Sequence, residues 1–208
     1  MKEVKLIMDK KYKEDTINYY DNNAEQYKNM WNIDFTKNYN FQVPDIFLEY
    51  LNTNAYILDL GCGAGRDSKY FMEKGYKVKS IDGSKQMCKI ASEYLNMEVE
   101  QMDFCDLNYK ETFDGIFACA SLLHLVNEDL ITCMKKIYEA LKKDGILYVS
   151  FKLGDEERIK EGRYFNDMTE EKFAEICNGV QGFKILKVWS EEPYEQHKPF
   201  INFILRKV

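Results

Sequence analysis

The sequence predicts an α/β fold with a mostly parallel sheet and helices on both faces. Helix-like and strand-like segments alternate through the middle of the chain, which is typical of parallel strands joined by crossover helices. An apolar strand runs into a glycine-rich loop at residues 57–67. At the end of the chain, the strand-like runs 183–189 and 200–206 are too close for a crossover helix, so they should pair antiparallel.

The elements are expected in a simple order. Apolar and aromatic residues recur at helical spacing from Ile17 to Trp31, and Pro44 can open a second short helix before the first strand. Asn127 is the expected cap of a strongly amphipathic helix. After the glycine loop we expect a helix at 66–74, a strand at 76–82, a helix at 84–95, strands at 97–102 and 113–119, a helix at 127–142 and a strand at 145–152.

Length and composition favour one globular domain over residues 1–208. The chain has 208 residues with no repeat and no Pro-rich or Gly/Ser-rich linker. It contains no apolar stretch of about 20 residues, and its first residues lack the apolar core of a signal peptide, so we expect a cytoplasmic protein without a membrane span. The six cysteines form no Cys-x-x-Cys pair, which predicts neither a metal site nor a disulfide framework.

The net charge also bears on the kind of partner. A formal charge of −6 disfavours a long polyanion such as a nucleic acid, unless the lysines gather on one face. The net charge therefore favours a small-molecule substrate over a nucleic acid.

The loop after the first strand is built to approach a ligand. Gly61, Gly63 and Gly65 allow a tight turn, and the following helix points free N–H groups at the site. A dinucleotide fingerprint needs a small residue three positions after Gly63, where this chain has Arg66. Asp59 is expected at the mouth of the loop, where a carboxylate repels a pyrophosphate and attracts an ammonium or sulfonium group.

A second acid follows at the expected end of the next strand. Asp82 comes twenty-one residues after Gly61, where a carboxylate can accept hydrogen bonds from both hydroxyls of a ribose. The sequence therefore predicts an adenosine-containing ligand with a cationic group.

At this point the chain resembles the class I S-adenosylmethionine-dependent methyltransferases. The resemblance runs from about Tyr20 to the C-terminus and rests on matches in order at residues 58–65, Ile81–Asp82, 102–104, 113–120 and 141–150. It implies a Rossmann-like seven-stranded sheet in which the seventh strand inserts antiparallel beside the fifth. Residues 1–51 would then form an N-terminal helical cap on a cofactor-binding core at 54–208.

The resemblance also implies where the cofactor, S-adenosylmethionine, is held. The carboxylate of Asp103 would meet the adenine amino group, and its neighbour Phe104 would flank the ring. The predicted cofactor contacts are Tyr20, Tyr27, Asp59, Gly61, Cys62, Gly63, Arg66, Asp82, Gly83, Ser84, Met87, Met102, Asp103, Phe104 and Ala118.

Three of the predicted site residues have a competing structural interpretation. Tyr20 and Tyr27 match a segment that covers the methionine end of the cofactor in relatives, where a hydroxyl could bind its carboxylate; they could equally form the apolar face of a helix. Arg66 could bind the same carboxylate, or pair with a neighbouring acid such as Asp67.

His124 follows the expected fourth strand, where the family often places a residue that faces the methyl acceptor. It is the candidate general base, and a base is needed only if the acceptor must lose a proton. The alternative is a neutral histidine packed among leucines with its nitrogens bonded to the backbone.

The charged stretch 152–164, flanked by glycines, could be a movable flap over the acceptor or simply a solvated loop. Arg158, Arg163 and Tyr164 are its expected substrate contacts.

The sequence thus predicts a methyltransferase that acts on a small-molecule acceptor. Two alternatives remain open at this stage: a methyltransferase that modifies tRNA or another RNA, which the acidic charge disfavours, and a regulatory subunit that binds the cofactor without catalysis. Fold alone does not fix the acceptor.

Overall fold

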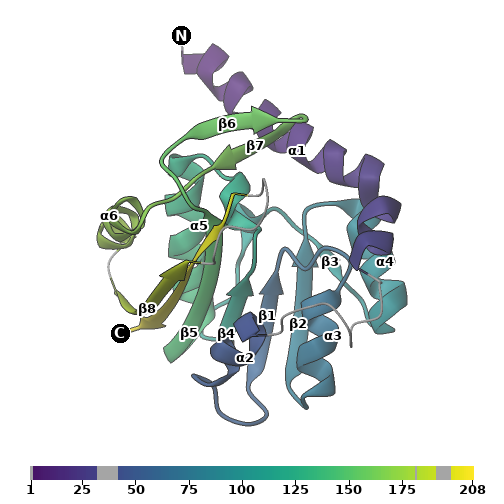
Figure 1. The fold of residues 1–208 in the computed structure, drawn as a ribbon, viewed down its shortest axis with the longest axis vertical. Coiled ribbons are helices and arrows are strands. Elements are labelled where there is room, and N and C mark those ends of the chain that lie inside the picture. Colours follow the sequence, from purple (N-terminus) through teal and green to yellow (C-terminus); the bar gives the residue numbers. More distant parts are fainter. Residues whose placement is uncertain (1, 32–41, 181, 191–197) are drawn as a thin grey trace.

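The computed structural model describes residues 2–31, 42–180, 182–190 and 198–208, with side chains described from residue 11 to residue 29 and in the later ranges. Its centre is a seven-stranded sheet in the order β3-β2-β1-β4-β5-β9-β8 (Figure 1). The strands are β1 (Tyr56–Leu60), β2 (Lys77–Asp82), β3 (Glu100–Gln101), β4 (Phe113–Ala118), β5 (Leu141–Lys152), β8 (Phe183–Ser190) and β9 (Phe200–Lys207).

The first five of these strands run parallel and the last two do not. β1 pairs in parallel with β2 and β4, and β4 in parallel with β5. β9 lies antiparallel between β5 and β8, with Ser150 opposite Asn202. The predicted antiparallel insertion beside the fifth strand is therefore confirmed.

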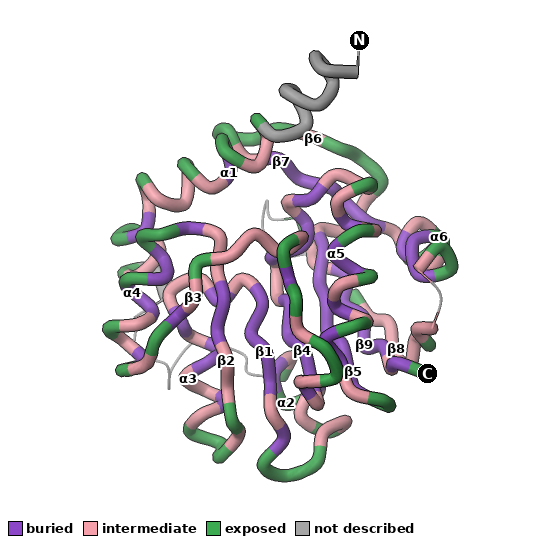
Figure 2. Tube along the Cα trace, turned by 180° about the vertical axis from the view of Figure 1, so that it is seen from behind, coloured by how far each residue is buried: buried purple, intermediate pink, exposed green. Residues whose placement is uncertain are grey.

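Helices cover both faces of the sheet. α2 (Gln42–Leu48) and α3 (Arg66–Glu73) pack on one face through Phe47 and Phe71, against Phe117 and Tyr148. α5 (Asn127–Ala140) and α6 (Glu170–Val180) pack on the opposite face. α4 (Lys85–Leu95) lies at the β2–β3 edge, and the strands between these layers are largely buried (Figure 2).

The carboxyl ends of the parallel strands are covered by two further elements (Figure 1). α1 (Lys2–Trp31) crosses this end of the sheet, and a two-stranded hairpin of β6 (Glu157–Lys160) and β7 (Arg163–Asn166) lies beside it. Two short 3₁₀ helices, η1 (Phe104–Asp106) and η2 (Leu122–His124), follow β3 and β4. The charged stretch that was predicted as a flap or a loop is therefore a paired hairpin, and α6 was not predicted.

Some predicted boundaries were wrong, for local reasons. β3 is confined to Glu100–Gln101 because the amides of Met97 and Val99 bond instead to the main chain and side chain of Ser92 in α4. α5 ends at Ala140 rather than 142, because the buried Leu141 already pairs with Phe113 in the sheet.

The cap of α5 was also assigned to the wrong residue. Val126 is the N-cap, and Asn127 is the first helical residue. Its side-chain oxygen accepts a hydrogen bond from Asn166 (2.9 Å), so Asn127 connects α5 to β7.

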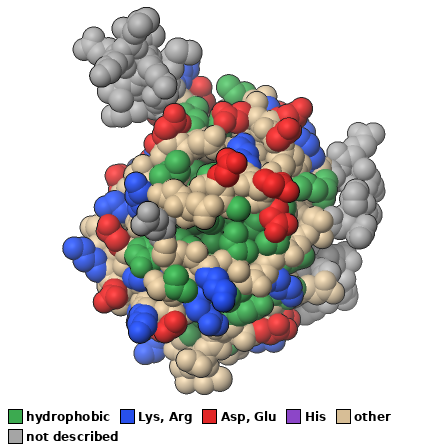
Figure 3. All heavy atoms as spheres, turned by 90° about the vertical axis from the view of Figure 1, so that its left-hand side faces the viewer, with side chains coloured by type: hydrophobic (Ala, Val, Ile, Leu, Met, Phe, Trp, Pro, Cys, Tyr) green, Lys and Arg blue, Asp and Glu red, His purple; other side chains and the backbone are tan. Residues whose placement is uncertain are grey.

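The surface and the helices give two further observations. On the face seen in Figure 3, acidic and basic side chains are interspersed around a central group of hydrophobic ones. Among the described helices, none combines the length and the apolar character needed to cross a bilayer. The cytoplasmic location stays a prediction, as does the single domain over residues 1–208.

Candidate active site

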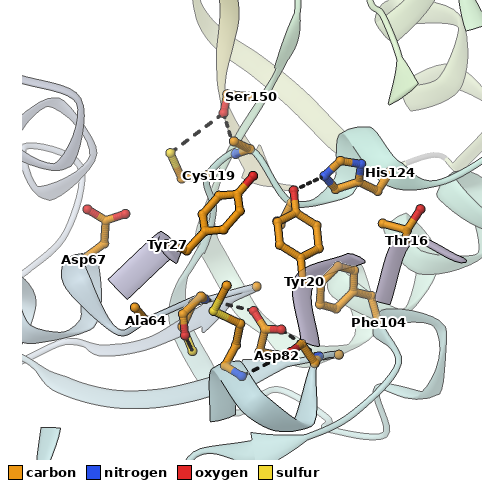
Figure 4. A pocket seen from close by; sticks show the side chains of 18 of the residues that line it. Thr16, Tyr20, Tyr27, Ala64, Asp67, Asp82, Phe104, Cys119, His124 and Ser150 are labelled. Atoms are coloured by element: carbon orange, nitrogen blue, oxygen red, sulfur yellow. Dashed lines mark hydrogen bonds between the residues drawn. The ribbon is translucent and has the colours of Figure 1, made fainter. Parts of the chain in front are cut away.

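A cavity of about 470 Å³ lies where the parallel strands end, beneath α1. This volume is within the range of about 300–1,000 Å³ that is usual for small-molecule sites. Its lining contains all the predicted cofactor contacts except Asp59 and Ala118, and Figure 4 shows several of them pointing at the same space. The predicted residues that do line it are Tyr20, Tyr27, Gly61, Cys62, Gly63, Arg66, Asp82, Gly83, Ser84, Met87, Met102, Asp103, Phe104 and His124.

The glycine loop forms part of the cavity floor with its main chain. Gly61 has φ +86°, and a Cβ there would overlap the Cβ of Ser121 and lie 3.2 Å from the ring of Phe104. Gly63 has φ +54°, and a Cβ there would meet no atom within 4 Å. Gly61 is therefore required for contact between β1 and the turn after β4, whereas Gly63 leaves open space for a ligand.

Asp82 is held by the same loop. Its carboxylate accepts hydrogen bonds from the main-chain N–H groups of Gly63 (2.9 Å) and Ser84 (2.8 Å). Burial raises the pKa of Asp82, and these two bonds oppose that shift. One bond on each carboxylate oxygen leaves lone pairs that can accept from the hydroxyls of a ribose.

Asp103 has partners that the sequence did not reveal. Lys13 of α1 lies 3.1 Å from its carboxylate, which also accepts a hydrogen bond from the amide of Cys105 (2.8 Å). Phe104, the next residue, borders the same part of the cavity. The adenine end predicted from the resemblance is thus closed by a residue of the N-terminal helix.

Asp59 is not at the mouth of the loop, so that prediction was wrong. Its side chain is only 2% exposed and accepts a hydrogen bond from Ser68 of α3. Burial raises its pKa to about 7. Ala118 is also fully buried, one residue before Cys119, which does line the cavity.

The electrostatic argument made for Asp59 applies instead to Asp82. Among the ionised side chains that line the cavity, Lys13 pairs with Asp103, and Arg66 forms two bonds to Asp67 at 3.0 and 2.7 Å. Asp82 accepts hydrogen bonds from main-chain amides and forms no ion pair with any cation of the described residues. The described lining therefore retains an excess negative charge, which favours a cationic ligand.

Arg66 thus forms the acid pair that was the competing interpretation of this residue. It also lines the cavity, so its predicted contact with the cofactor carboxylate stays a prediction.

His124 and Tyr20 form a hydrogen-bonded pair inside the cavity (Figure 4). The Oη of Tyr20 lies 2.8 Å from Nε2 of His124, and Nδ1 of His124 lies 2.6 Å from the main-chain oxygen of Tyr164. Burial lowers the pKa of His124 to about 4, so the ring is neutral at neutral pH. Its predicted position beside the acceptor is compatible with this geometry, because both residues line the cavity.

The three predicted lid residues lie behind the cavity wall rather than in it. Arg163 donates a hydrogen bond to the Oη of Tyr27 (2.7 Å), and its guanidinium lies 4.1 Å from the centre of the Tyr19 ring. Arg158 forms two bonds to the buried Asp167. The hairpin therefore supports the tyrosines of α1 instead of contacting the cavity through these residues.

Several lining residues were missed by the sequence analysis. Lys13, Thr16 and Ile17 precede Tyr20 at helical spacing on α1, a signal that was available. On the other side, polar residues interrupt the apolar strands β5 and β9. The other lining residues that were missed are Val43, Ala64, Asp67, Cys119, Ala120, Ser121, Leu125, Tyr148, Ser150, Phe200 and Asn202.

Comparison with known proteins shows similarity to methyltransferases. An uncharacterized methyltransferase of Staphylococcus carnosus is 27% identical over 160 residues, which are 70% of this chain and 77% of that protein. A methyltransferase-domain family model matches residues 57–145, the segment that contains the glycine loop, Asp82 and Asp103. Residues 57–145 thus match a methyltransferase domain, and the chain is similar to a methyltransferase over most of its length. S-adenosylmethionine is accordingly the cofactor of this methyltransferase.

Other relatives show how widely the fold is used. Carboxy-S-adenosyl-L-methionine synthase of Helicobacter pylori is 33% identical over 123 residues, and this chain spans about half the length of that protein (49%). A Burkholderia thailandensis 1,6-didemethyltoxoflavin-N1-methyltransferase, solved with its substrate and S-adenosylhomocysteine, superposes with a TM-score of 0.77 at 20% identity. That superposition covers 96% of this methyltransferase and 90% of the other chain.

The residues of the cavity fit the cofactor. The open space at Gly63 leaves room for a ligand against the main chain, and Asp82 offers acceptors beside it. The Oγ of Ser121 is buried without a partner among the described residues, as expected of a group that awaits a ligand.

Proposed function

We propose that this methyltransferase transfers a methyl group to a small-molecule acceptor. The observation that supports this most directly is the shape of the cavity. Besides the predicted cofactor contacts, the cavity is lined by Tyr148, Ser150, Phe200 and Asn202, and by residues of α1 that include Lys13, Thr16 and Ile17. A chamber of this kind suits a compact acceptor better than a polymer.

The bound cofactor supplies a methyl group on a positively charged sulfur, ready for in-line displacement. The protein's part is then to bind, orient and exclude water. Gly61 and Gly63 bring the main chain close, Asp82 accepts from the sugar, and Phe104 flanks the base. α1 excludes water from above.

RNA is the less supported acceptor. The chain carries a net charge of −6, and the face seen in Figure 3 mixes acidic and basic side chains. Binding to RNA phosphates depends on a concentrated positive field.

The proposal is tested first by binding and then by turnover. Isothermal titration calorimetry should show S-adenosylmethionine binding with a dissociation constant in the micromolar range, about −8 kcal/mol, and no binding of NADH. Purified protein is then incubated with S-adenosylmethionine and either fractionated metabolite pools or total RNA, and S-adenosylhomocysteine is measured.

We expect turnover in a metabolite fraction. Turnover confined to RNA would contradict the small-molecule acceptor. If no pool yielded S-adenosylhomocysteine, the proposed activity would be contradicted. A preference for NADH would contradict the site assignment itself.

A further inference from the structure

The hydrogen bonds around His124 fix where its proton lies. The main-chain oxygen of Tyr164 can only accept, so Nδ1 of His124, 2.6 Å away, must carry the proton. Because the ring is neutral, Nε2 has no proton and is an acceptor. The group that bonds to Nε2 is the hydroxyl of Tyr20, at 2.8 Å.

The proton of Tyr20 is therefore directed at His124. A phenol has one proton, so while this bond exists the Tyr20 oxygen can only accept from a ligand in the cavity. It is consequently unsuited to donate to the cofactor carboxylate, the role first predicted for it. It is suited to receive an N–H, O–H or S–H group.

Charged groups surround this pair from the elements packed on it. Arg163 of β7 lies 5.8 Å from the centre of the Tyr20 ring and lowers the pKa of Tyr20, although burial raises that pKa more strongly. Arg163 and Arg158 of β6 both oppose protonation of His124. Phe165 packs edge-on to the His124 ring, with centroids 4.8 Å apart.

We propose that Tyr20 and His124 form a two-step proton relay that removes a proton from the methyl acceptor. This inference rests on the proposed function. As the acceptor atom forms its bond to the methyl carbon, the carbon–sulfur bond breaks and its electron pair stays on sulfur. The acceptor's proton passes to the Tyr20 oxygen, and the Tyr20 proton passes to Nε2 of His124. The resulting imidazolium donates from both nitrogens and loses its extra proton to solvent on product release.

A weakly basic histidine is adequate for this step. An acceptor hydroxyl or amide becomes strongly acidic as the methyl group bonds to it, so its proton moves downhill even to a base with a low pKa. A base of pKa about 4 also stays unprotonated throughout the neutral range. Arg163 stabilises the negative charge that develops on the Tyr20 oxygen while the protons move.

The first test reads the proton positions without any acceptor. Nitrogen-15 NMR of the imidazole rings distinguishes the two neutral tautomers, and His124→Gln assigns the signals, because His197 is the only other histidine in the sequence. We expect the Nδ1–H tautomer for His124, and a shift of its Nε2 signal in Tyr20→Phe. The Nε2–H tautomer would overturn the relay.

The second test is kinetic and uses the metabolite fraction found active with S-adenosylmethionine. Tyr20→Phe should lower kcat by roughly 10²-fold and change the dissociation constant for S-adenosylhomocysteine by less than about three-fold. His124→Gln keeps a hydrogen-bond acceptor near the Tyr20 hydroxyl but cannot take a proton, so it should also lower kcat. The double variant should be no worse than either single one.

A matched control is available one residue away. Tyr19→Phe makes the same change on α1 at a hydroxyl that donates to the exposed Glu161 and does not belong to the cavity lining, and it should leave kcat unchanged. An unaltered kcat in Tyr20→Phe, or a loss wholly explained by weaker cofactor binding, would overturn the relay. If no metabolite or RNA pool yielded S-adenosylhomocysteine, the proposed function would be contradicted, and the NMR result would still decide the proton positions.

Discussion

The floor and the cover of the cavity are built in different ways. The floor, formed by Gly61, Gly63 and Asp82, uses main-chain turns and hydrogen bonds from main-chain amides over short sequence separations, 19 residues for Gly63–Asp82. The cover, formed by α1 and the β6–β7 hairpin, uses side-chain bonds over long sequence separations, 104 residues for Tyr20–His124 and 136 for Arg163–Tyr27. We therefore expect the floor to determine which cofactor binds and the cover to determine which acceptor reaches it.

The largest expected effect comes from adding a methyl group to the floor. Gly61→Ala should lower the free energy of unfolding by about 2–4 kcal/mol, because a left-handed backbone and an overlap with Ser121 are both imposed. Gly63→Ala has the strained φ but no overlap, so it should cost about 1–2 kcal/mol. Urea denaturation of both variants measures the difference.

Cofactor binding separates these two variants in a second way. The added methyl of Gly63→Ala projects into open space at the cavity, so S-adenosylmethionine should bind more weakly although the fold is nearly intact. Equal stability of the two variants would mean that the close contact between Gly61 and Ser121 is not part of the folded structure.

The next largest effect is expected from replacing Asp82, the acidic residue of the floor. Asp82→Ala should weaken S-adenosylmethionine binding by about ten-fold or more, since it removes charge-assisted bonds to the ribose and leaves the amides of Gly63 and Ser84 without their partner. Asp82→Asn keeps one side-chain oxygen, so its affinity for S-adenosylmethionine should lie between those of the unaltered protein and of Asp82→Ala. Calorimetric titration measures both, and unchanged affinity in Asp82→Ala would refute the assignment of the ribose end.

A smaller effect is expected from the cover. Arg163→Met removes the bond to Tyr27 and the charge over the Tyr19 ring, and should weaken cofactor binding by about three- to five-fold, or roughly 1 kcal/mol. Arg163→Lys keeps the charge and should lose less. If Arg163→Met weakened binding more than Asp82→Ala, the cover rather than the floor would dominate affinity.

The same contrast explains what the sequence could predict. The place of Gly61, Gly63 and Asp82 at the cavity could be predicted, because it depends on neighbours along the chain and on an ordered set of motifs. The helical spacing of Lys13 from Tyr20 could have placed it at the cavity, but its pairing with Asp103, 90 residues away, could not be predicted from the sequence. His124 was found, but its tautomer depends on the Tyr164 carbonyl, which only the folded hairpin brings to it.

Strand geometry accounts for the error at Asp59. Side chains alternate along β1, so Asp59 shares the face of Ile57 and lies beneath α3, where Ser68 donates to it. The prediction considered that Asp59 lies near the end of the strand, but not which face of the sheet its side chain points to. On β5 and β9, the pairing of Ser150 with Asn202 was a readable signal, since buried polar residues in apolar strands need a reason.

The buried acid beneath the floor predicts a dependence of stability on pH. The pKa of Asp59 is raised by burial to about 7 from 3.8, so the folded state holds this proton more tightly than the unfolded state. Its contribution to stability is therefore full below the unfolded pKa and is lost as pH rises toward 7. Asp59→Asn, which keeps an oxygen for Ser68, should abolish this part of the pH dependence. Urea denaturation of both proteins between pH 4.5 and 7.5 gives the difference, and a gap between them that does not change with pH would show that Asp59 is ionised in the fold throughout.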